Sequence, residues 1–227
     1  MAGSREYFDL LASLPALPYF EKAERNPINR SRLWERLHML EPDDLSRVRR
    51  AAEFLAWQRQ PAARTDAEMV SMYESFIRRT RTPLLREIVE YRMNQRTVLA
   101  ALRRRRAGRP APNPGEAWGV GPWALPLRRN WGDPDFQLAA VFRWLPEARS
   151  LLDSGNAIEL DRLLFRDEWC WLERLELGSE FSTEALLKYL FQWDILDLWL
   201  SYDAQAAHER FEELVVEVTG EHYKLFN

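Results

Sequence analysis

Four consecutive arginines, Arg103 to Arg106, are the most prominent charged feature of this chain of 227 residues. Two roles are open for them. Cations in the last turn of a helix stabilise its negative end and cap its carbonyls. A run of this length, followed by Arg109, can also bind an acidic protein surface, nucleic acid phosphates or anionic headgroups. If the second role holds, we predict that Arg103, Arg104, Arg105 and Arg106 form one contact patch.

Nucleic acid is the disfavoured partner for this run. The chain as a whole carries a net charge of −3, and no aromatic residues are interleaved with the arginines as they are in nucleic-acid-binding segments. A helical nucleic-acid-binding or regulatory protein that uses Arg103–Arg106 remains the alternative hypothesis.

Ten tryptophans offer a second set of candidate contacts. Those in helical segments are predicted core residues. Trp118, Trp123 and Trp131 lie instead in a stretch rich in Pro and Gly, where aromatic side chains on conformationally restricted loops make good interface anchors. We predict Trp118 and Trp123 as partner-binding residues, with core packing as the alternative.

Catalytic and metal-binding patterns are missing from the sequence. His38, His208 and His222 have no metal-ligand spacing. The single cysteine, Cys170, excludes a site built from several thiolates, and we predict it to be a small buried hydrophobe. Asp194 and Asp197 form one weak acidic pair, for which helix solvation or a partner contact is favoured over Mg²⁺.

No glycine-rich phosphate-binding motif and no nucleophile elbow occurs in the chain. We therefore predict a non-catalytic protein with no cofactor, no metal and no directly bound nucleotide.

Helical periodicity dominates the elements that must position these residues. Residues 83–107 open with Pro83, repeat apolar residues every three or four positions and end at Gly108, which predicts a rod of about 35 Å. Residues 108–134 concentrate Pro and Gly, which excludes regular helix there and predicts an ordered crossover. Further helices are predicted over 31–40, 43–60, 66–79, 135–145, 146–155, 156–177, 182–203 and 204–220.

The predicted fold class is therefore all-α, a multi-helix bundle with one long helix and a crossover loop rich in Pro, Gly and Trp. Residues 1–110 carry 22 basic against 14 acidic residues, and residues 111–227 carry 10 against 21. This contrast suggests a basic helical part (1–110), the crossover (111–134) and an acidic helical part (135–227), which can also form one continuous domain.

The N-terminal segment lacks the long apolar run of a signal peptide, and no stretch reaches the roughly 18 apolar residues of a membrane-spanning helix. We expect a cytoplasmic protein.

Three segments resemble a bacterial family encoded beside V-type (A/V-type) ATPase subunits. The first, residues 7–37, contains Tyr7-Phe8, the run Ser-Leu-Pro-Ala-Leu at 13–17, and Pro27-Ile28 before a helix. The second is the long helix with YRMNQRTVLAALRRRRAG at 91–108. The third, residues 181–218, contains Gln-Trp-x-Ile-Leu-Asp at 192–197 and Phe-Glu-Glu-Leu at 211–214.

The resemblance implies a stand-in for the C (or d) subunit, an all-helical part that couples the rotor stalk to the membrane ring during ion translocation. It implies partners among the other V-type ATPase subunits, a location peripheral to the inner membrane, and no catalytic residue.

Overall fold

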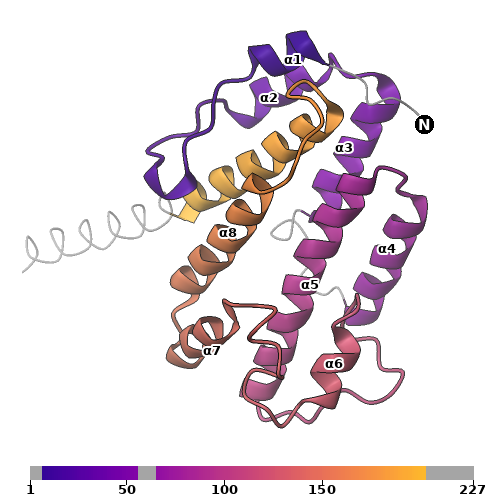
Figure 1. Cartoon of the computed structure of the whole chain (residues 1–227), viewed down its shortest axis with the longest axis vertical. Coiled ribbons are helices and arrows are strands. Elements are labelled where there is room, and N and C mark those ends of the chain that lie inside the picture. The colour runs from indigo at the N-terminus through magenta and orange to yellow at the C-terminus, as the bar shows by residue number, and fades with distance from the viewer. Residues whose placement is uncertain (1–6, 56–64, 203–227) are drawn as a thin grey trace, which may run out of the picture. The chain divides into compact units, whose positions relative to one another are not determined.

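A computed structural model describes residues 7–55 and 65–202 of the chain. Every regular element in these ranges is a helix (Figure 1). This confirms the predicted all-α fold. Among the described residues, no helix combines the length and the apolar character needed to cross a bilayer.

The helices follow the predicted order closely. In chain order they are α1 (Phe8–Ser13), the short 3-10 helix η1 (Phe20–Lys22), α2 (Arg30–Leu37), α3 (Pro42–Leu55), α4 (Asp66–Arg79), α5 (Pro83–Arg106), α6 (Ala124–Arg129), α7 (Leu145–Ser154) and α8 (Ala157–Glu173). A further helix covers residues 183–202. The predicted helix at 204–220 lies outside the described residues.

Local capping explains why several helices begin where they do. The Asn29 side chain accepts a hydrogen bond from the backbone N–H of Arg32 and starts α2. Thr65 and Glu68 form a reciprocal capping box at α4. Pro83 occupies the first turn of α5, where its missing N–H costs no hydrogen bond.

Two predictions, one for the crossover and one for the segment after it, are wrong. Residues 124–129 form the short helix α6, because Pro126 falls within its first turn and removes no intrahelical bond. Residues 135–144 form turns rather than a helix. Phe136 and Gln137 both have positive φ, which ends any helical continuation there.

The chain divides into two compact units that differ from the parts suggested by charge. Unit 1 combines residues 1–39 with 178–227, and unit 2 spans residues 40–177. Pro110 therefore lies inside unit 2, because α5 and the crossover share their hydrophobic core with α7 and α8. Unit 1 contains 9 basic and 15 acidic residues and unit 2 contains 23 and 20, so their net charges are −6 and +3.

Unit 1 is built around the helix at 183–202. None of residues 183–200 is exposed, and Leu186, Trp193 and Leu196 are among those that are buried. The N-terminal segment packs along it. The Tyr7 N–H donates to the Phe181 carbonyl at 2.7 Å, and the Trp193 Nε1–H donates to the Ile28 carbonyl at 2.9 Å.

Four further contacts extend this packing. The rings of Phe8 and Phe181 lie 4.5 Å apart, and those of Phe20 and Trp199 meet edge to face at 5.5 Å. Asp197 accepts hydrogen bonds from Arg30 at 2.7 Å and from Asn26 at 3.2 Å.

Replacing Tyr189 with Phe is expected to destabilise unit 1 by about 1 kcal/mol, because it removes the hydrogen bond that the Tyr189 hydroxyl donates to the Pro15 carbonyl at 2.9 Å. Burial raises the pKa of Tyr189 to about 12. A raised pKa favours the neutral phenol in the folded state, so its contribution is complete below pH about 10 and is lost as the pH rises through 12. Urea unfolding at pH 8 and pH 11 tests this: the cost of Tyr189→Phe should be smaller at pH 11, and an equal cost at both values would contradict it.

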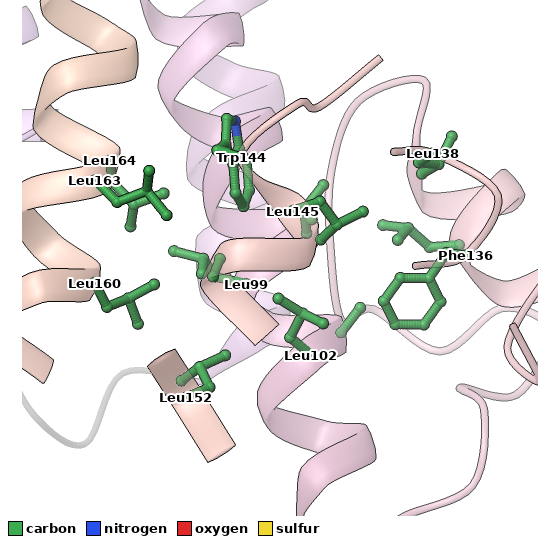
Figure 2. Packing of buried hydrophobic residues seen from close by; sticks show 14 of the residues in the cluster. Leu99, Leu102, Phe136, Leu138, Trp144, Leu145, Leu152, Leu160, Leu163 and Leu164 are labelled. Atoms are coloured by element: carbon green, nitrogen blue, oxygen red, sulfur yellow. The ribbon is translucent and has the colours of Figure 1, made fainter. Parts of the chain in front are cut away.

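One hydrophobic cluster of unit 2 joins the C-terminal half of α5, the crossover, α7 and α8. Figure 2 shows Leu160, Leu163 and Leu164 of α8 directed toward the leucines of α5 and α7. Trp144 and Leu145, at the start of α7, fill the middle of this cluster. Trp118 and Leu127 belong to the same cluster, so the crossover is part of the core rather than a free linker, and Phe136 and Leu138 extend the cluster into the turns that follow.

Candidate functional site

The end of α5 places its four arginines in two different environments. Arg104 and Arg105 turn toward the crossover, whereas Arg103 and Arg106 are exposed. A helix turns about 100° per residue, so four consecutive side chains cannot share one face. The helix geometry therefore divides the four arginines, which were predicted to form one contact patch, into two pairs.

Arg104 fastens the first part of the crossover. Its Nε–H donates to the Pro110 carbonyl at 2.9 Å, and its guanidinium forms an ion pair with Glu116. The hydrogen bond from Arg104, together with the backbone N–H of Asn113, lowers the pKa of Glu116. The Glu116 carboxylate therefore stays charged near neutral pH.

Arg105 fastens the last part of the crossover. Its guanidinium donates to the carbonyls of Asp133 and Pro134, and lies over the ring of Phe136 at 4.5 Å from the centroid. A planar cation that meets two carbonyls and one aromatic face is a geometry that arginine satisfies and lysine does not.

The Asp133 side chain stabilises the strained turn to which Arg105 binds. Its carboxylate accepts hydrogen bonds from the backbone N–H groups of Asp135 and Gln137, at 2.8 and 3.0 Å. These bonds lower the pKa of Asp133 and compensate the positive φ values of Phe136 and Gln137, which are 51° and 57°.

Replacing Arg105 with Lys is expected to destabilise unit 2 by about 1 kcal/mol, because a lysine cannot bind both carbonyls in one plane and the site is partly solvated. Arg106→Lys is the matched control on the next residue and should change stability by less than about 0.5 kcal/mol, since Arg106 is exposed. Thermal unfolding of both variants measures the difference, and equal effects would show that the Arg105 contacts contribute nothing.

The crossover tryptophans face the core. Trp118 is only 8% exposed, and Trp123 and Trp131 pack against the same cluster. Trp123 meets Phe142 edge to face at 5.3 Å, and Trp131 lies 5.5 Å from Phe136. These positions agree with the core-packing alternative; Trp118 has little surface left for a partner, and a partner role for Trp123 stays a prediction.

The sequence did not predict a group of buried polar side chains that lies between α5 and α8. Glu168 accepts a hydrogen bond from Arg92 in an ion pair whose side chains are 5% and 6% exposed. Beside it, Tyr91 donates to Asp167, and the Tyr91 ring stacks on Trp171 at 4.2 Å. Burial is the main cause that raises the pKa of both Tyr91 and Asp167. The sequence feature that could have indicated this group is the presence of two polar residues, Tyr91 and Gln95, within the apolar face of α5.

The remaining candidates are separated in the structure. Cys170 is exposed, so its prediction as a buried hydrophobe is wrong; it lies on the outer side of α8, next to the buried Trp169. Asp197 pairs with Arg30. His38 bonds the Trp34 carbonyl, one turn earlier. His208 and His222 lie outside the described residues. Within residues 7–55 and 65–202, no cluster of His, Cys, Asp or Glu has the makings of a metal site.

The fold and this site define an all-helical protein whose long α5 ends in an arginine-fastened crossover. The sequence places it in a family: a family profile described as "Protein of unknown function (DUF2764)" matches residues 51–222, and the chain belongs to that family. No curated protein and no solved structure matches the chain.

Proposed function

We propose that this chain is a non-catalytic, C/d-like subunit of a V-type ATPase that links the rotor stalk to the membrane ring during ion translocation. In this role it works through protein contacts with other subunits of the complex and binds no nucleotide itself. Its location is then cytoplasmic and peripheral to the inner membrane.

The observation that carries the proposal is the mutual packing of the residues on which the resemblance rests. Pro15 of the Ser-Leu-Pro-Ala-Leu run accepts a hydrogen bond from Tyr189. Ile28 of the Pro-Ile element accepts one from Trp193 of the Gln-Trp-x-Ile-Leu-Asp run. Segments that resemble the ATPase-associated family at the two ends of the chain therefore belong to one folded unit. This packing favours a resemblance of one whole folded unit to that family over chance similarity of separate helices.

The construction of unit 2 also suits a coupling part. A subunit that transmits torque needs stiff elements, and the 24-residue α5 is about 36 Å long and is fastened along its length. Its N-terminal half is joined to α8 by the Arg92–Glu168 pair, and its C-terminal end to the crossover by Arg104 and Arg105.

Affinity purification of the tagged full-length chain from detergent-solubilised membranes of its own host tests the proposal. Mass spectrometry is expected to recover V-type ATPase stalk subunits in amounts well above a tag-only control. Recovery of none of these subunits from cells that express the ATPase would contradict the proposal.

A second measurement separates this function from the nucleic-acid-binding alternative. Filter binding to duplex DNA and to single-stranded RNA, repeated over a salt series, should give at most weak retention at low salt. Strong retention that falls steeply with salt would favour the alternative instead.

A further inference from the structure

The C-terminal ends of α5 and α6 lie at the same end of unit 2. Val120, just before α6, exchanges hydrogen bonds with Thr97 in the middle of α5, at 3.0 and 3.1 Å. Asp133 and Pro134, just after α6, are bound by Arg105 near the end of α5. The two helices therefore run side by side in the same direction (Figure 1).

Both helix ends are rich in arginine, and the carboxylates of the segment that contains them are already engaged. Residues 103–137 contain three acidic groups. Glu116 pairs with Arg104, Asp135 pairs with Arg149, and Asp133 accepts two backbone hydrogen bonds beneath Arg105. Five arginines of this segment have no side-chain partner among the described residues, and we call them the basic end: Arg103, Arg106, Arg109, Arg128 and Arg129.

We propose that the basic end is a docking surface for an acidic segment of a partner protein. The inference rests on the proposed function for the identity of that partner, a stalk subunit. Its chemistry follows from the five arginines and from the net charge of +3 on unit 2. Charge complementarity of this kind speeds docking and fixes its orientation.

An acidic protein fits this surface better than nucleic acid does. Proteins that bind single strands stack bases on exposed aromatic rings, but Trp118 is buried, and Trp123 and Trp131 are partly buried against the core. The exposed side chain beside the arginines is aliphatic instead. Leu125 is 42% exposed, one helical turn from Arg128 and Arg129 on α6. An apolar contact flanked by arginines is typical of protein interfaces.

Fluorescence anisotropy with a labelled poly-glutamate peptide at low salt tests the surface directly. The double variant Arg103→Gln/Arg106→Gln should weaken binding by about 5-fold. The matched control is Arg79→Gln/Arg81→Gln, which changes the charge of unit 2 by the same amount at exposed positions and should leave binding within about 2-fold. Both variants should melt at the wild-type temperature, since all four side chains are exposed.

Three results would overturn the inference: absence of peptide binding by the wild type, an equal loss in the control, or tighter binding of oligo(dT) or phosphatidylglycerol vesicles than of the peptide. The affinity purification described above separates its failure from that of the proposed function. Stalk subunits recovered equally by wild type and Arg103→Gln/Arg106→Gln would reject the basic end and keep the function. Their absence with the wild type, despite specific peptide binding, would reject the function and keep the acidic-partner chemistry.

Discussion

Replacing Glu168 with Gln is expected to destabilise unit 2 by about 3–5 kcal/mol. The substitution keeps the size of the side chain but removes its charge, so the buried Arg92 guanidinium loses the carboxylate that Glu168 supplies. Breaking a buried ion pair in this way costs far more than breaking a surface ion pair, because the surrounding side chains exclude the water that would solvate the remaining charge. Urea unfolding followed by circular dichroism measures the change.

Two companion variants make the Glu168 experiment specific. Glu90→Gln introduces the same chemical change into a half-exposed ion pair with Arg86 on α5, and should cost less than about 0.5 kcal/mol. The double variant Arg92→Met/Glu168→Leu removes both charges and should recover most of the lost stability. A Glu168→Gln variant no less stable than Glu90→Gln would mean that water reaches the pair.

Replacing Phe136 with Ala is expected to destabilise unit 2 by about 3–5 kcal/mol. The Phe136 side chain is fully buried, packs against Trp131 and supports the guanidinium of Arg105. Its removal leaves a cavity in the core and also weakens the grip of Arg105 on the crossover. The backbone strain at this position persists in the variant, because alanine tolerates a positive φ no better than phenylalanine does.

Gln137→Gly provides a control with the opposite sign at the neighbouring position. Gln137 is exposed and has a φ of 57°, so glycine relieves strain without removing a buried side chain. The hydrogen bond to Asp133 comes from the backbone N–H and is retained. Thermal unfolding should show Gln137→Gly at least as stable as the wild type. A loss in Gln137→Gly comparable to that in Phe136→Ala would show that backbone rigidity, not core packing, holds this turn.

Much of the secondary structure follows from local signals. The predicted α4 and α5 agree with the structure to within one residue, because capping groups, Pro83 and Gly108 act over a single turn. The turns at 135–144 were missed because their apolar residues are compatible with a helical period. The positive φ values there depend on Asp133 and Arg105, which act from outside the segment.

The division into units was beyond a charge-based analysis. Net charge changes sign near Pro110, but folding is driven by burial of apolar surface rather than by separation of charge. Residues 98–102 of α5 and the leucines of α8 therefore share one core across that boundary. By contrast, the two ends of the chain resemble one family, and the structure places both ends in a single unit.

The sequence by itself determined that this protein is helical, that one long helix ends in arginines, and that an ordered crossover follows. All three are written in short-range patterns of residue type. Only the tertiary structure decided that Arg104 and Arg105 fasten the crossover while Arg103 and Arg106 face solvent, and that Arg92 is matched by Glu168. The physical reason is that the packing of distant segments determines the partner of a charged side chain. The residues next to it in the sequence do not determine that packing.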